Sequence, residues 1–443
     1  RRTFTIPATW DGRAIYINFD GVDSFFYLWI NGKYVGFSKN SRNTATFNIT
    51  DFLVKGENTV AVEVYRNSDG SFLEAQDMFR LPGIIRSTYL TSTPMVQVRD
   101  LVVRTTIPTE SGLTTANGTV TIDAEIRNLG KKDAKEYSLE YHVYPNVLYS
   151  DATLAEVGTP VKSDRITIAK AQSADMQTKF VIENANLWSA EQPYRYTLVA
   201  ELKDKKGRTV ETISTHFGVR HVEIRDTKAE DDEFGLAGRY FYVNNKPVKL
   251  KGVNRHETNP TRGHAITRQQ MEKEVMLMKQ GNINHVRNSH YSCEPYWYYL
   301  CDKYGIYQED ETNIESHEYY YGEASLSHPA EWRNAHVARN MELVRAHVNF
   351  PSIVIWSLGN EAGPGKNFVA AYEAIKAFDT SRPVQYERNN NIVDIGSNQY
   401  PSIAWVQGAV TGKYDIKYPY HISEYAHSMG NAGGKLVDYW DAM

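Results

Sequence analysis

Residues 352–361 read SIVIWSLGNE, an apolar run that ends in glycine, asparagine and glutamate. A short apolar run bounded by turn residues is typical of a strand that is buried on both faces, as in a parallel sheet. Similar runs occur on both sides of it, separated by stretches with helical periodicity. The other predicted strands are VKLKGVN at 248–254, HVRNSH at 285–290, IYQED at 306–310, PVQYE at 383–387, VDIGS at 393–397 and YHISE at 420–424.

Helices are predicted between these strands, at 268–281, at 295–305, near 330–348 and at 366–378. Strands that alternate with helices in this number favour a (β/α)8 TIM barrel over an open doubly wound sheet, which needs fewer such units. We therefore predict a barrel over 220–443, with its last strand beyond Met443.

The first half of the chain is predicted to form two β-sandwiches. Short alternating runs such as AIYINFDG, FYLWING and TVAVEVY fill residues 1–100, separated by Gly, Asn and Asp turns. Runs such as VTIDAEIRN and YRYTLVAEL continue the pattern over 101–219, a segment of roughly immunoglobulin size. A chain of 443 residues fits such a multidomain arrangement.

Composition narrows the classes of partner. The net charge of −4 is spread along the chain without a basic run, which argues against nucleic acid. No run of 18 apolar residues occurs, so no membrane span is predicted. Aromatic residues make up 12% of the chain, which suits stacking on sugar rings, although a large β-rich core gives the same count.

Cysteine usage and the start of the chain say little about location. Cys293 and Cys301 are too few for a disulfide framework or a four-cysteine metal site, so we expect packing residues. The sequence starts at Arg1 with neither a methionine nor a hydrophobic leader, so an export signal is neither seen nor excluded. We expect that the beginning is missing and that the protein is cytoplasmic, with a periplasmic or secreted location left open.

Carboxylates follow two of the predicted barrel strands, at the end where TIM barrels build their active sites. Glu361 follows the strand at 352–360 and Glu424 ends the strand at 420–424. Hydrolysis of a glycoside needs one carboxyl group to protonate the leaving oxygen and another to attack or stabilise the anomeric carbon. A gap of about 5–5.5 Å implies retention and one of roughly 6.5–9.5 Å inversion. The residues alone leave open that either glutamate is a salt-bridge partner.

Glu315 and His317 stand two apart in NIESH, so in an extended segment both side chains point to the same side. Two such groups can hold one cation. Oxygen-rich ligation with a single imidazole is compatible with Mg²⁺ and also with Mn²⁺.

Two motifs carry a resemblance to a known family. WSLGNEAGPG at 356–365 resembles the acid/base motif of glycoside hydrolase family two, and SEYAHSMGN at 423–431 resembles the nucleophile motif of its β-galactosidase branch. FDGVDSFFYLWINGKYVGFSKNSR, SDGSFLEAQDMFRLPGIIR, KLKGVNRHE and MKQGNINHVRNSHY also match, in the family's order. The resemblance implies a partial jelly-roll, sugar-binding-like β-sandwich at 1–100, an immunoglobulin-like β-sandwich at 101–219 and a catalytic TIM barrel at 220–443.

The resemblance also implies roles for single residues. It implies retention, with Glu424 as the nucleophile and Glu361 as the acid/base. Mg²⁺ would bind Glu315, His317 and Glu361, and Asp77 in AQDMFR would reach the galactose 6-OH and share a Na⁺. The implied substrate contacts are His256, His290, Asn360 at the sugar 2-OH, Tyr400 beside the nucleophile, and His427.

The expected function is hydrolysis of terminal non-reducing β-D-galactosides, such as lactose, through a covalent galactosyl-enzyme. Glucuronidases and mannosidases of the family share the two glutamates but not the AHSMGN continuation, which favours galactose. A β-glucuronidase and a non-catalytic carbohydrate-binding protein with an inactive barrel stay as alternatives. We expect a dimer or tetramer, because the family commonly assembles that way.

Overall fold

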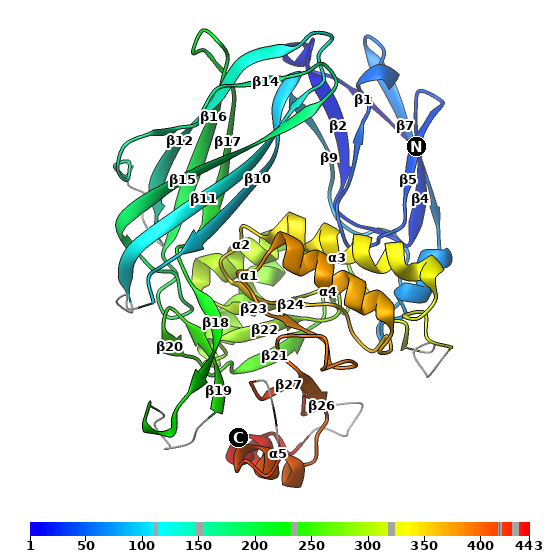
Figure 1. Ribbon diagram of the computed structural model, residues 1–443. Coiled ribbons are helices and arrows are strands. Elements are labelled where there is room, and N and C mark those ends of the chain that lie inside the picture. The colour runs from blue at the N-terminus through cyan, green and yellow to red at the C-terminus, as the bar shows by residue number, and fades with distance from the viewer. Residues whose placement is uncertain are drawn as a thin grey trace.

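In the computed structural model, two β-sandwiches lie side by side on one side of a parallel sheet (Figure 1). The structure describes residues 1–109, 114–147, 154–231, 238–317, 324–414, 416, 419–427 and 434–443. Within these ranges, no helix is both long and apolar enough to cross a membrane.

The first sandwich packs a four-stranded sheet, in the order β1-β7-β4-β5, on a three-stranded sheet, in the order β6-β2-β9. Alternate residues of β4 point inward: Phe26, Leu28 and Ile30 are buried against Ile17 and Phe19 of β2. Its strands and short 3-10 helices are β1 Arg2–Thr5, η1 Ala8–Trp10, β2 Ala14–Phe19, β3 Val22–Asp23, β4 Phe25–Ile30, β5 Lys33–Ser38, β6 Ala45–Asn48, η2 Thr50–Phe52, β7 Glu57–Tyr65, η3 Asp69–Leu73, β8 Gly83–Ile84 and β9 Thr88–Thr93.

The second sandwich packs the sheet β10-β11-β15 on the sheet β13-β12-β16-β17. Burial alternates along β11, where Val120, Ile122 and Ile126 are fully buried, and β16 contributes Leu198 and Leu202 to the same core. Its strands are β10 Val96–Thr106, β11 Thr115–Asn128, β12 Ala134–Asn146, β13 Val161–Lys162, β14 Ile166–Ile168, β15 Ser173–Asn186, β16 Arg195–Lys203 and β17 Thr209–Phe217.

The third part contains the parallel strands. Five of them form one sheet in the order β21-β22-β23-β24-β25, and β26 and β27 form a parallel pair. The strands are β21 Gly252–Arg255, β22 His285–Asn288, β23 Tyr307–Glu311, β24 Ile353–Ser357, β25 Val384–Gln385, β26 Ser397–Gln399 and β27 His421–Glu424. The helices are α1 Arg268–Gln280, α2 Pro295–Tyr304, η7 Ala330–Trp332, α3 Arg333–His347, α4 Lys366–Phe378, α5 Ile403–Val410 and α6 Leu436–Ala442.

Local signals place the helices at the predicted positions. Thr267 caps α1 by accepting a hydrogen bond from the Gln270 amide, and α2 begins with Pro295 in its first turn. Gly305 ends α2 at φ +75°, where a Cβ atom would lie 2.2 Å from the Ala190 carbonyl oxygen. Helices α3 and α4 lie on the side of the sheet that faces the sandwiches (Figure 1).

Three features differ from the sequence prediction. The strand expected at 393–397 begins only at Ser397, because the amides of Asp394 and Ile395 both donate to the Val384 carbonyl and break the ladder. Helices α5 and α6 were not predicted. A three-stranded antiparallel sheet also precedes the barrel strands, formed by β18 Val222–Thr227, β19 Gly238–Val243 and β20 Lys246–Pro247, with the short η4 Ala229–Asp231.

Candidate active site

The two candidate carboxylates lie at the carboxyl ends of parallel strands. Glu424 is the last residue of β27, and Glu361 lies in the loop that follows β24. The side chain of Asn254, next to the end of β21, donates to the Ser423 carbonyl at 2.9 Å and so ties β21 to β27. Polar groups from strands that are distant in sequence therefore meet at one end of the sheet.

Arg287 of β22 is the central cation of this end, and its side chain is 2% exposed. Its guanidinium donates to Glu424 at 2.8 Å, to Glu311 at 2.9 Å and to the Asn360 side-chain oxygen at 2.9 Å. A third carboxylate, Glu309, lies 3.3 Å away. A guanidinium offers several donors in one rigid planar fork, so Arg287 sets the positions of Glu424 and Asn360 together.

Glu424 is held in its ionised form. Burial alone would raise its pKa, but the charges of Arg287 and His290 and the hydrogen bond from Tyr400 lower the pKa to about 2. Gln399 donates to Oε1 at 3.0 Å, and the Tyr400 hydroxyl donates to Oε2. The carboxylate is therefore ionised near neutral pH and needs no deprotonation before it can act as a nucleophile.

Glu361 sits on a strained backbone, with φ +34° in the left-handed region. Its amide donates to Glu387 Oε1 at 2.8 Å, and its own Oε1 accepts from Arg388 at 2.7 Å. The other oxygen, Oε2, lies 3.3 Å from His317 Nε2. Burial raises the pKa of Glu387 to about 7. Both the backbone and the side chain of Glu361 are therefore fixed by neighbours.

The side chains of Glu315, His317 and Glu361 could hold a metal ion. Each offers one ligand atom, and these atoms all lie within 4.8 Å of one another. Glu315 is buried, and its Oε1 has no hydrogen-bond partner among the described residues, whereas Oε2 accepts from Asn360 at 3.0 Å. An unpartnered buried carboxylate oxygen is free to ligate a cation, so the donor set fits a small divalent ion.

Two predicted histidines form a pair. The His256 and His290 rings are 5.2 Å apart, and His290 Nδ1 lies 2.6 Å from Glu311 Oε1. Burial and the neighbouring positive charges lower the pKa of His256 to about 3, so it is neutral near pH 7. Burial and Arg287 would also lower the pKa of His290, but Glu311 and Glu315 raise it.

Tyr400 and His427 stand on the solvent side of Glu424. Tyr400 is 44% exposed, and its ring centroid lies 5.7 Å from that of His427 in an edge-on arrangement. The backbone of Tyr400 is left-handed, with φ +51°. This turn lets Gln399 and Tyr400, which are adjacent in sequence, reach the two oxygens of the same carboxylate.

A loop of the first sandwich joins the barrel beside the metal-ligand group. The amide of Ala75 donates to the Glu315 carbonyl at 2.7 Å, and the Glu315 amide donates to the Leu73 carbonyl at 2.8 Å. The Gln76 side chain donates to Asn313 at 2.8 Å. Asp77 itself is exposed, so its neighbours, and not Asp77, make the contacts that dock this loop.

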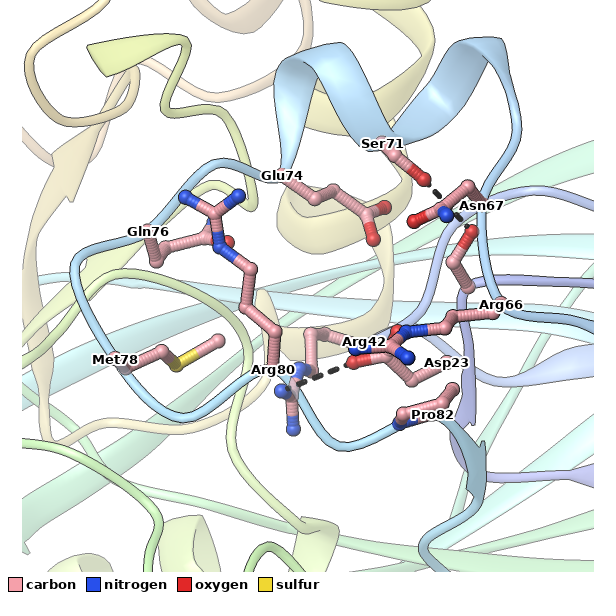
Figure 2. A pocket seen from close by; sticks show the side chains of 11 residues that line it. Asp23, Arg42, Arg66, Asn67, Ser71, Glu74, Gln76, Met78, Arg80 and Pro82 are labelled. Atoms are coloured by element: carbon pink, nitrogen blue, oxygen red, sulfur yellow. Dashed lines mark hydrogen bonds and ion pairs between the residues drawn. The ribbon is translucent and has the colours of Figure 1, made fainter. Parts of the chain in front are cut away.

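Residues of this loop also line a polar cavity of about 60 Å³. Asp23, Arg42, Glu74 and Arg80 are among its lining residues (Figure 2). Arg42 is buried, lies 3.6 Å from Asp23, and stacks on the Tyr291 ring of the barrel at 4.3 Å. Two of its nitrogens, Nη1 and Nη2, have no hydrogen-bond partner among the described residues. The first sandwich therefore presents a polar wall where it meets the barrel.

Sequence reasoning missed five residues of this site, which are Arg287, Glu311, Glu387, Arg388 and Gln399. One signal could have found the first. Arg287 lies inside the predicted buried strand HVRNSH, and a charged residue is almost never fully buried unless it is paired. Its partners come from other strands, so their identity depends on the barrel closing.

Three family models match the chain in succession. They are the sugar binding domain of glycosyl hydrolases family 2 at residues 1–94, the glycosyl hydrolases family 2 model at 96–220 and the family 2 TIM barrel domain at 234–443. These matches and the strand arrangement confirm the predicted fold class of two β-sandwiches followed by a TIM barrel.

Curated relatives match over the whole of this chain. The beta-galactosidase of Priestia megaterium (strain DSM 319 / IMG 1521) is 39% identical over 450 residues, which cover 99% of this chain and 41% of that protein. The beta-galactosidase of Psychromonas ingrahamii is 35% identical and is matched over 100% of this chain and 42% of its own length. The chain thus spans about two fifths of the length of these relatives.

Solved structures share the fold at lower identity. A Bacteroides uniformis beta-glucuronidase superposes with a TM-score of 0.78 at 21% identity, covering 96% of this chain and 52% of that one. A glycosyl hydrolase family 2 member from Bacteroides cellulosilyticus DSM 14838 gives a TM-score of 0.77 at 22% identity, covering 100% and 56%. At this identity the likeness concerns the fold alone.

Proposed function

The chain belongs to glycosyl hydrolases family 2, and from that premise we propose that it hydrolyses terminal non-reducing β-D-galactosides, such as lactose, with retention. The observation that carries the proposal is that two buried or half-buried carboxylates lie at the carboxyl ends of strands of the barrel: Glu424 is held by Arg287, and Glu361 is held by Arg388. Arg287 also donates to Asn360, the residue before Glu361. Relatives at 35–39% identity that are described as beta-galactosidases support galactose as the sugar.

In the first step, the ionised Glu424 attacks the anomeric carbon and Glu361 gives its proton to the leaving oxygen. The bond from the anomeric carbon to the aglycone oxygen breaks as the ester to Glu424 forms. Asn360 would hydrogen-bond the sugar 2-OH, an interaction that grows stronger as positive charge develops on the sugar. Arg287 and Tyr400 keep the attacking carboxylate in place until then.

In the second step, Glu361 removes a proton from water, and the water oxygen replaces the ester oxygen at the anomeric carbon. Glu424 leaves as a carboxylate, which regains its hydrogen bonds from Tyr400, Gln399 and Arg287. Because the same three donors stabilise the departing anion, they assist the breakdown of the ester.

We propose Mg²⁺ as the ion held by Glu315, His317 and Glu361, with Mn²⁺ as a substitute. The mixed carboxylate and imidazole donors and the unpartnered Glu315 oxygen support this assignment. A divalent ion there supplies positive charge beside the acid/base. We also propose that Asp77 contributes to a Na⁺ site near the sugar 6-OH, because its loop is docked against Glu315.

Replacing His317 with alanine is expected to weaken Mg²⁺ binding by at least about 10-fold, since one ligand of three is lost. Isothermal titration of the purified, metal-stripped protein with MgCl₂ measures this affinity. His221→Ala is the matched control, because His221 is also half-buried and lies 3.7 Å from a glutamate, but in the β18 sheet. Equal affinity of His317→Ala and wild type would exclude this ligand set.

Trapping with an activated 2-deoxy-2-fluoro-β-galactoside tests the proposed function, because the fluorine slows breakdown of the covalent intermediate. Mass spectrometry of the intact protein and its peptides should find one adduct, on the peptide that contains Glu424. Labelling by the corresponding glucuronide reagent instead would show that the sugar is wrong. A folded protein that no reagent labels and that turns over no aryl glycoside would leave the non-catalytic alternative.

A further inference from the structure

Two side chains outside the catalytic pair connect Glu361 to Glu424. Arg388 Nη2 donates to Glu361 Oε1 at 2.7 Å and to the side-chain oxygen of Gln399 at 2.8 Å. The Gln399 nitrogen in turn donates to Glu424 Oε1 at 3.0 Å and to the Asn360 side-chain oxygen at 3.0 Å. An unbroken chain of hydrogen bonds thus runs from one carboxylate to the other.

The orientation of this chain is fixed by its chemistry. Arg388 can only donate and the Glu424 carboxylate can only accept, so the Gln399 amide must turn its oxygen to the arginine and its nitrogen to the glutamate. The reversed amide would place oxygen against carboxylate oxygen and NH₂ against guanidinium. Both hydrogens of the Gln399 nitrogen then have acceptors, Glu424 and Asn360.

The backbone holds both bridging residues in position. Arg388 follows Glu387, whose carboxylate accepts a hydrogen bond from the Glu361 amide. Two adjacent side chains after β25 therefore hold Glu361, one at its backbone amide and one at its carboxylate. Gln399 ends β26, which pairs with β27 and aligns Gln399 with Glu424. The two ends of the bridge are therefore anchored on different strands, next to the carboxylates they contact.

We propose that Arg388 and Gln399 are positioning residues that form a bridge and set the gap between the Glu361 and Glu424 carboxylates. This rests on the proposed galactosidase function. The gap matters because a separation of about 5–5.5 Å serves attack by the second carboxylate, and a wider one admits a water instead. With the bridge intact, the proton donor stays above the leaving oxygen while the nucleophile stays below the anomeric carbon.

The experiment compares two substrates in the wild type and five variants of the purified protein. Phenyl β-galactoside needs protonation of its leaving group, whereas 2,4-dinitrophenyl β-galactoside does not. Arg388→Ala and Gln399→Met each remove the bridge, the double variant removes both halves, and Arg388→Lys restores the charge. Asn389→Ala is the control, because Asn389 is the next residue in the same loop and its side chain bonds only the Pro364 carbonyl among described residues.

Arg388→Ala is expected to lower kcat/KM for the phenyl substrate roughly 10- to 100-fold, the effect of losing a hydrogen bond to a charged group. The dinitrophenyl substrate should lose less than about 3-fold, because its first step does not use Glu361 as an acid. The double variant should be no worse on the phenyl substrate than the worse single variant, since both act on one bridge. Arg388→Lys should recover part of the loss, with melting temperatures unchanged throughout.

Equal losses on the two substrates in Arg388→Ala, or additive losses in the double variant, would overturn the bridge. So would an Asn389→Ala loss as large as that of Arg388→Ala, because the loop as a whole would then be responsible. Failure of the proposed function is seen separately, since wild type would then cleave neither galactoside before any variant is compared.

Discussion

Glu424→Gln is expected to abolish turnover of β-galactosides and leave the fold unchanged. The amide matches the carboxylate in shape but cannot attack the anomeric carbon, so we expect a loss of roughly 10⁴- to 10⁶-fold in kcat, as when a covalent nucleophile is removed elsewhere. Arg287 keeps Glu311 and Glu309 as partners, so the buried cation stays paired in the variant. Steady-state rates on an aryl galactoside, with circular dichroism as the folding control, measure the effect.

The variant Glu361→Gln tests which of the two glutamates is the acid/base and which is the nucleophile. Loss of general acid–base catalysis should lower the rate about 10²- to 10⁴-fold, and less for a substrate with an activated leaving group. Added azide should replace water as the nucleophile in the second step. The product should then be a β-galactosyl azide. The same rescue of Glu424→Gln should give the α-azide. If Glu424→Gln kept one tenth of the wild-type rate, another residue would have to be the nucleophile.

Arg287→Lys is expected to lower kcat/KM and to change the pH profile. A lysine cannot hold Glu424, Glu311 and Asn360 together, so hydrogen bonds to charged groups worth about 1.5–3 kcal/mol are lost, or roughly 10- to 100-fold in kcat/KM. Burial would raise the pKa of Glu424, but the charge of the neighbouring Arg287 helps to lower it to about 2. Weakening this partner raises that pKa, so activity on the acid side should fail at a higher pH than in wild type.

The same logic gives the sign for stability. A carboxylate with a lowered pKa stabilises the fold above its unfolded value of 4.5, and this contribution is lost as pH falls from there toward about 2. Arg287→Lys should therefore lose less stability on acidification than wild type. Arg382→Lys is the matched control: Arg382 is also buried, but it pairs with Asp379 and the carbonyl of Ile353, at the amino end of β24. In Arg382→Lys, the pH at which activity falls on the acid side should be the same as in wild type.

The sequence predicted the strand and helix order of the barrel because the physical signals are local. Buried strands are short apolar runs and α1 has a threonine cap, and both can be read within about a dozen residues. The strand at 393–397 was misplaced because its irregularity depends on which carbonyl two amides share. This hydrogen-bond pattern depends on the neighbouring strand, so it cannot be predicted from the local sequence.

The site followed the same division. Glu361, Glu424, Glu315 and His317 were predicted, because they stand at strand ends and in matching motifs. The residues that hold them were not. Glu387 and Gln399 act only through partners that are far away in sequence, and their residue types are common on any protein surface. Residues that hold other side chains in position can be recognised only once the barrel is assembled, whereas the candidate reactive residues can be recognised from sequence motifs.

Two backbone hydrogen bonds between residues 73–75 and Glu315 join the first sandwich to the barrel, so the two domains depend on each other at this point. A barrel cut out after residue 219 would lose the partners of the Glu315 amide and carbonyl, and with them the alignment of a residue that lies beside Glu361. For the same reason, a one-residue insertion between Leu73 and Ala75 would shift the register of that contact. The contact at residues 73–75 therefore limits how freely the barrel could be recombined with other folds.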